Sequence, residues 1–134
     1  MTRKEQKEEK LRKEKEFIDS IKDTHIDGKI KELFRRTSIW KNFRNELKEE
    51  RKVDALTGRK LTKTFNTHHM RFDSRLYTDL DKEFFLVLNT QIHDWLHIAI
   101  SETIKDPAFM DKAKELVVKH IRINNGKDIK DFKE

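Results

Sequence analysis

Apolar side chains are too few in this chain to build more than one thin core. They make up 34% of the 134 residues, whereas charged residues make up 42%. A chain of this length accommodates one domain, and a composition this polar requires parts of it to be solvated helix or tail. Nine phenylalanines and two tryptophans still supply large surfaces for packing. We therefore expect one small domain with long polar flanks.

The first sixteen residues are the most polar part of the chain. They interleave basic residues with glutamates and contain Leu11 as their only large apolar residue after the first. Such a segment is either a solvated helix or a basic arm that becomes ordered on DNA. From Phe17 to Phe34 apolar residues recur at helical spacing, and Gly28 interrupts them. Residues 1–35 are thus predicted to form a charged helical arm, whose apolar stripe offers a route to homodimer formation.

The next segments combine helical and strand patterns. Thr37 and Ser38 are good N-caps for a helix that ends near Lys52. Residues 64–70 are rich in threonine and aromatic side chains, which favours a strand. The continuous apolar run 84–88 fits either a second strand or the entry to a helix. The stripe predicted to face the core from the helix is Trp40, Phe43 and Leu47.

Two more helices are predicted before a polar tail. Asn89 or Thr90 can cap the first, which must stop before Pro107. That proline suits the first turn of the last helix, which runs to about Ile121. Residues 124–134 read as a polar C-terminal tail. The last helix is expected to turn inward an apolar face made of Phe109, Ala113, Leu116, Val117 and Ile121.

Four of the six histidines fall between positions 68 and 97. His93 and His97 are four residues apart, so on a helix they stand one turn above each other and can reach a single ion or phosphate. His68 and His69 are adjacent near a strand end, where successive side chains point to opposite faces. One is then suited to ligate a metal and the other to take a proton. Because the chain has no cysteine, any metal site must use histidines or carboxylates.

The order of these histidines and apolar runs resembles the ββα-metal motif of the HNH, or His-Me finger, endonucleases. The pair His68-His69, the run 84–88 and the pair His93-x-x-x-His97 look like the strand, strand and helix of that motif. Their spacing is similar to that of the colicin-type nucleases. The resemblance implies an α+β fold, a mostly helical small domain around a ββα-metal motif.

A second stretch upstream carries the same resemblance. Residues 38–44 and 54–61 are similar to the lead-in of small phage and bacterial HNH proteins, which makes residues 36–123 the nuclease domain with its flanking helices. Two positions depart from the family pattern. Phe84 stands where the family usually has an asparagine, and Asp54 stands about where the first cysteine of a structural zinc site would be.

By resemblance, the chain would be a DNA endonuclease that hydrolyses phosphodiester bonds with a histidine base and one divalent metal ion. His69 would be the general base. His68, the other catalytic residue, would hold the metal together with His93, and His97 would be the third ligand or a phosphate contact. Imidazole ligands can bind Mg²⁺, Mn²⁺, Ni²⁺ or Zn²⁺, so all four ions are candidates. Replacing His69 with alanine is then expected to abolish cleavage and to leave the fold intact.

The charge balance fits a nucleic-acid partner. A formal net charge of +6 favours DNA, and the basic residues nearest the motif are candidate phosphate contacts. A charged N-terminus and the lack of a long apolar run predict a protein without a membrane segment. With the family resemblance, we expect it in the cytoplasm of a bacterium or a phage-infected cell. The candidate phosphate contacts are Arg59, Lys60, Lys63, Arg71 and Arg75.

Two other interpretations stay open. A catalytically degenerate HNH-fold module would bind DNA or protein with strong salt dependence and cut nothing. A small helical interaction protein would use the histidines to hold a structural zinc, and removal of the metal would unfold it. A further alternative is that the chain has no such motif, and that one or two of the four histidines are ordinary core or surface residues.

Overall fold

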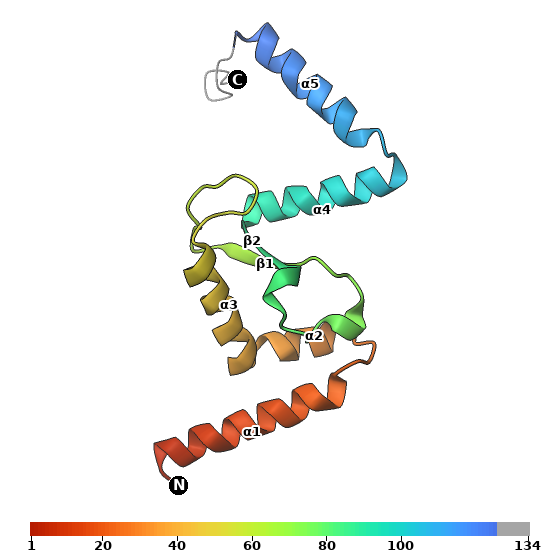
Figure 1. Ribbon diagram of the computed structural model, residues 1–134. Helices are drawn as coiled ribbons and strands as arrows, with labels where there is room; N and C mark the ends of the chain where they lie inside the picture. Colours follow the sequence, from red (N-terminus) through yellow and green to blue (C-terminus); the bar gives the residue numbers. More distant parts are fainter. Residues whose placement is uncertain (126–134) are drawn as a thin grey trace. The chain divides into compact units, whose positions relative to one another are not determined.

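The computed structural model describes residues 1–125, and Figure 1 shows their secondary structure. This part of the chain contains five α-helices, a two-stranded antiparallel sheet and two short 3-10 helices. The expected α+β, mostly helical class is confirmed. In chain order the elements are α1 (Arg3–Ile21), α2 (Gly28–Arg35), α3 (Ser38–Arg51), β1 (Phe65–His69), η1 (Ser74–Leu76), η2 (Lys82–Phe84), β2 (Phe85–Asn89), α4 (Thr90–Lys105) and α5 (Phe109–Ile123).

The chain divides into two compact units, Met1–Ile92 and His93–Glu134. The boundary falls inside α4, so the first turn of this helix belongs to the first unit. Residues 1–35, expected as a separate arm, lie in the same unit as the strands. Of the expected polar tail 124–134, only the first two residues lie within the described part of the chain.

Capping side chains explain where the first three helices begin. Thr2, Asp27 and Thr37 each accept a hydrogen bond from the backbone N–H three residues later, at 3.1, 2.9 and 3.2 Å. This satisfies a donor that has no partner within the helix. Gly28 begins α2, so the interrupted apolar pattern from Phe17 to Phe34 corresponds to two separate helices. Lys52 ends α3 in a left-handed conformation with φ 62°.

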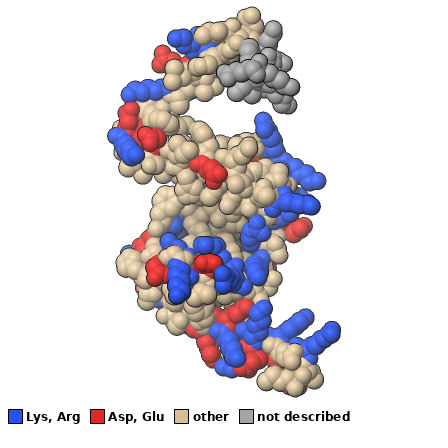
Figure 2. Space-filling view, turned by 180° about the vertical axis from the view of Figure 1, so that it is seen from behind, with Lys and Arg blue, Asp and Glu red and all other residues tan. Residues whose placement is uncertain are grey.

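The helix α1 is attached to the rest of its unit near its C-terminal half. The carboxylate of Glu14 accepts hydrogen bonds from the backbone N–H and the hydroxyl of Ser38, at 3.0 and 3.1 Å. Phe17 and Ile18 pack against the core. Basic and acidic side chains are interleaved along this helix, as the lower part of Figure 2 shows, and Arg12 pairs with two glutamates of its own helix. The mixed charge favours a solvated helix over a purely basic arm.

The core of the first unit is aromatic and lies between α2, α3 and one face of the sheet. The helical stripe predicted from the sequence is confirmed, because all three of its side chains are buried. Phe43 and Phe85 meet edge to face with their ring centroids 4.9 Å apart. The buried core residues are Phe34, Trp40, Phe43, Leu47, Leu61, Phe65, Phe85 and Val87.

The strands β1 and β2 pair with each other in an antiparallel register that sets His69 opposite Phe85. The apolar run 84–88, whose pattern fits either a strand or the entry to a helix, lies in strand β2 except for Phe84, which ends η2. Two arginines of α3 hold the pair in place. Arg44 donates to the carbonyl of Phe65 at 3.0 Å, and Arg51 donates to the carbonyls of Phe85 and Lys82.

The prediction for the last helix is wrong in two respects, its first residue and the burial of its apolar face. α4 ends at Lys105, before Pro107 as expected, but α5 begins only at Phe109. No residue of α5 is buried, and Leu116 and Val117 are both 57% exposed. Spacing shows that a helix has an apolar face, but burial also requires a neighbour that covers it. Across residues 1–125, no helix has both the length and the apolar character needed to cross a membrane.

Candidate metal centre

The two adjacent histidines of β1 lie on opposite faces of the sheet. His69 faces the aromatic core, where its ring lies 5.6 Å from that of Trp40 and 4.7 Å from that of Phe85. His68 is only 3% exposed and belongs to the other face of the strand. The alternation expected from the sequence therefore separates the two imidazoles.

The start of α4 is fixed by contacts within the first unit. The backbone N–H of Thr90 donates to the carbonyl of Thr64 at 3.1 Å, and its hydroxyl donates to the same carbonyl. The side chain of Asn89 accepts from the backbone N–H of Thr62 at 2.8 Å. Because α4 is continuous, His93 follows Thr90 by less than one turn of a helix whose beginning is anchored next to β1.

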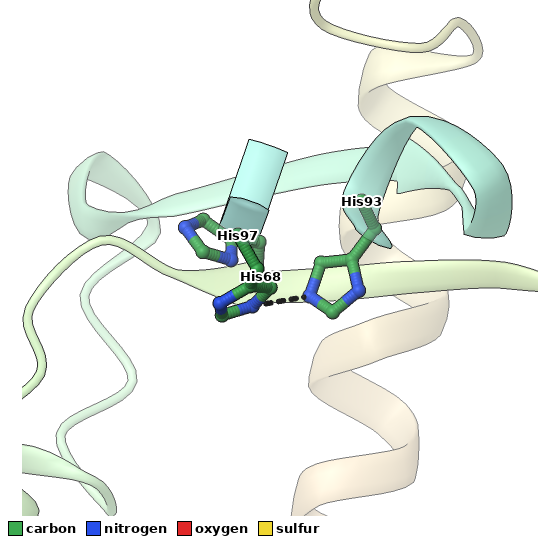
Figure 3. A group of neighbouring side chains, drawn as sticks. All are labelled: His68, His93 and His97. Atoms are coloured by element: carbon green, nitrogen blue, oxygen red, sulfur yellow. Dashed lines mark hydrogen bonds between the residues drawn. The ribbon is translucent and has the colours of Figure 1, made fainter. Parts of the chain in front are cut away.

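Three histidines form a group that fits a metal ion. His68, His93 and His97 each offer one ring nitrogen, and these nitrogens lie within 4.8 Å of one another; Figure 3 shows the three rings. The Nε2 atoms of His93 and His97 are 3.0 Å apart. Two nitrogens bound to one tetrahedral zinc at 2.0–2.1 Å would be about 3.3 Å apart, so the spacing suits a shared cation. His97 is exposed, which brings the group to the surface.

The surroundings of His93 favour the form that binds metals. Burial lowers the pKa of His93, the proximity of His97 lowers it further, and the carboxylate of Asp94, 3.6 Å from Nδ1, opposes both effects. The result is a pKa below the ordinary histidine value. A neutral imidazole is the species that ligates a cation, so less proton release is needed on binding at neutral pH.

His69 is not brought into this group, and its environment explains what it can do. Its ring stacks on Tyr77, with centroids 4.2 Å apart. Its Nε2 lies 3.2 Å from the carbonyl oxygen of Tyr77, which can only accept a hydrogen bond, so Nε2 carries the proton and Nδ1 keeps the lone pair. Burial lowers the pKa of His69 to about 4. The ring is also part of the packing, so the expectation that alanine at this position leaves the fold intact is not supported.

Asp54 has a structural task that its sequence position alone did not reveal. It is 1% exposed, and its carboxylate accepts hydrogen bonds from the backbone N–H groups of Leu56, Thr57 and Asn89 at 2.9, 2.8 and 2.7 Å. Burial opposes its ionisation, but these N–H groups outweigh burial and hold the pKa of Asp54 below its ordinary value. The carboxylate of Asp54 thus connects the loop after α3 to the last residue of β2. The chain has no cysteine that could make this connection through a zinc ion.

Phe84, at the position of the family asparagine, takes part in closing the loop between the strands. The guanidinium of Arg71 lies 4.0 Å from the centre of its ring, and the backbone N–H of Met70 donates to its carbonyl at 2.9 Å. Arg71 also pairs with Asp79 at 3.2 Å. A cation over an aromatic ring thus connects the two ends of the segment between the strands.

The five basic residues predicted to contact phosphates fall into two groups. Arg71 and Arg75 are engaged in ion pairs with aspartates, the latter with Asp73 at 2.7 Å. The side chains of the other three, Arg59, Lys60 and Lys63, make no ion pair with any residue from 1 to 125. Arg59 also lines a pocket of about 390 Å³ at the start of α4 together with threonine side chains. Arg59, Lys60 and Lys63 are therefore better candidates than Arg71 and Arg75 for contacting a phosphate.

Comparisons of the chain with family models, curated proteins and solved structures found no match. A functional assignment consequently depends on the geometry of the chain's own residues. Residue type and spacing pointed to the three grouped histidines. Sequence reasoning missed Tyr77 and Phe72, which contact His69 and His68. No pattern in the sequence signals these contacts, because both residues lie in a polar segment without regular spacing.

Proposed function

We propose that the protein is a metal-dependent endonuclease of the ββα-metal type that hydrolyses phosphodiester bonds in DNA. The observation that carries this proposal is the group of His68, His93 and His97, whose ring nitrogens lie within 4.8 Å of one another. Support comes from the order of elements around it, an antiparallel pair β1 and β2 followed directly by α4. The net charge of +6 suits an anionic polymer as substrate.

The donor set indicates which cation the site would hold. Three imidazoles without a carboxylate among them suit Zn²⁺ or Ni²⁺ better than Mg²⁺, which prefers oxygen ligands. A cation at such a site supplies Lewis-acid stabilisation of the negative charge that develops on a phosphate. His93 and His97 stand on successive turns of one helix, which limits how far their nitrogens can separate.

The proposal gives His69 the role of proton acceptor. Its neutral form prevails at neutral pH, and the hydrogen bond from Nε2 to the Tyr77 carbonyl leaves Nδ1 as the atom that takes a proton from water. Stacking on Tyr77 and Trp40 holds the ring in one orientation. Arg59, Lys60 and Lys63, whose side chains make no ion pair within residues 1–125, would contact backbone phosphates.

One observation favours a second function. The ring of His69 lies among core aromatics and apart from the three-histidine group, as it would in a protein that binds metal and DNA without cutting. Such a module would keep salt-sensitive DNA binding. Both functions use the same metal site. They differ in whether the bound DNA is hydrolysed.

The test is incubation of the purified chain with supercoiled plasmid in Ni²⁺, Zn²⁺, Mn²⁺, Mg²⁺ or EDTA. We expect nicking or linearisation with a transition metal, its loss in EDTA and in His97→Ala, and full activity in His120→Ala, a matched change at an exposed histidine outside the group. His69→Gln, checked for folding by circular dichroism, should bind metal and DNA but not cut. A folded, metal-loaded wild-type protein that cuts nothing would move the assignment to the binding module.

A further inference from the structure

Phe72 is a large apolar side chain exposed beside the candidate metal centre. It is 62% exposed, among the highest values for a large apolar residue of the first unit. Its ring lies 5.9 Å from the ring of His68, at an interplanar angle of 75°. His68 itself is almost fully buried. An aromatic ring is therefore presented to solvent next to the group that would hold a metal ion.

The backbone on both sides of Phe72 is anchored. On one side, Arg71 lies over the ring of Phe84 and pairs with Asp79. On the other side, Asp73 caps the short helix η1 by accepting from the backbone N–H of Arg75 at 3.0 Å. A side chain presented from a segment held at both neighbours loses less conformational freedom on binding than one on a loose loop.

We propose that Phe72 stacks on an unpaired base of the DNA strand whose phosphate would contact the metal ion held by the three-histidine group. This inference rests on the proposed function and adds a substrate class to it. A base in a duplex is already stacked on both sides, so a protein ring can stack on it only where the strand is single or distorted. Phe72 then selects single-stranded or locally unpaired DNA near the cleaved bond.

The geometry also explains why a phenylalanine serves here. The ring offers a flat apolar surface that every base can stack on, so the contact would be indifferent to sequence. The ring is also uncharged. An acidic side chain at this position would repel the phosphate of the DNA substrate. The competing role for Phe72 is a simple cover over His68, in which case its loss would weaken metal binding and leave DNA binding unchanged.

The test is fluorescence anisotropy with a labelled oligonucleotide of about 12 nucleotides, single-stranded or as a duplex, with Ni²⁺ bound and in the His69→Gln background, which is expected to hold metal and DNA without cutting. We expect Phe72→Ala to weaken single-strand binding by about tenfold or more, with duplex binding unchanged and Phe72→Tyr close to wild type. Leu56→Ala, which removes a 56% exposed apolar side chain elsewhere in the first unit, should have no effect.

Equal weakening of single-strand and duplex binding, or none, would overturn the inference. So would weaker Ni²⁺ binding by Phe72→Ala with oligonucleotide binding intact. The oligonucleotide-binding measurement does not depend on whether the protein cuts DNA. If the wild-type protein cuts no DNA but Phe72→Ala loses single-strand binding, the nuclease proposal fails and the base contact stands. If the wild type cuts plasmid and Phe72→Ala binds normally, only the base contact fails.

Discussion

The buried carboxylate of Asp54 accepts a hydrogen bond of 2.7 Å from the backbone N–H of Asn89, the residue that immediately precedes α4. The other oxygen of the same carboxylate holds the N–H groups of Leu56 and Thr57. One side chain therefore connects the loop after α3 to the start of the helix that carries His93. We therefore expect a substitution at Asp54 to affect the candidate metal centre through this connection.

Replacement of Asp54 with alanine should lower the free energy of unfolding by about 2–4 kcal/mol, because three backbone N–H groups lose their acceptor in a buried place. Asp54→Asn should cost less, since one amide oxygen can still accept from Leu56 and Thr57, while its NH₂ group faces the N–H of Asn89. Urea unfolding measures both effects. Asp81→Asn, at an exposed cap, is the control. Equal stability of Asp54→Ala and wild type would contradict the role given to this carboxylate.

His69 should make the fold sensitive to mild acid. Its pKa is lowered from 6.5 to about 4 by burial, so the folded protein binds fewer protons than the unfolded chain between these values. The free energy of unfolding contributed by this residue is therefore constant above about pH 6.5 and falls as the pH drops toward 4. Between pH 7 and 5 the loss should be about 1–2 kcal/mol.

The variant that isolates this effect is His69→Phe, which keeps a flat ring beside Trp40 and Tyr77 but cannot be protonated. Its stability should fall less between pH 7 and 5 than that of the wild type, while His93, whose pKa is also lowered, contributes equally to both proteins. Asp54 and Asp73, with lowered pKa values, lose their contributions only below about pH 4. The same pH dependence in both proteins would show that His69 is not the titrating group.

Salt dependence of DNA binding should separate the two groups of basic residues. Arg59→Ala is expected to weaken binding to duplex DNA and to reduce the slope of log affinity against log salt by about one, as for the loss of one phosphate contact. Arg75→Ala should change the slope less, because its guanidinium is occupied by Asp73. Anisotropy titrations between 50 and 200 mM salt, roughly the range where such effects are large, measure both slopes. A larger change for Arg75 than for Arg59 would contradict this division.

Local patterns of the sequence predicted much of the candidate site. The four-residue step between His93 and His97 and the alternation between His68 and His69 follow directly from helix and strand geometry. The sequence pattern also predicted that residues 64–70 form a strand, and β1 spans Phe65–His69. These features depend on neighbours within a few positions of the chain.

Features that depend on distant partners were not predicted. The apolar spacing of α5 indicated a buried face, but Leu116 is 57% exposed because spacing does not specify a neighbour. The backbone N–H groups that donate to Asp54 come from its own loop and from Asn89, 35 positions later. Likewise, the stacking of His69 on Tyr77 arises where the loop between the strands folds back, and no local period encodes that contact.

Calorimetric titration of Ni²⁺ into the metal-free protein, prepared without a histidine tag, tests most directly whether the three histidines form a metal centre. We predict one ion bound per chain, with affinity weakened at least about tenfold in His68→Ala and in His97→Ala, and unchanged in His120→Ala. The absence of stoichiometric binding by the folded wild type, or wild-type affinity in His97→Ala, would contradict the centre and with it the proposed nuclease.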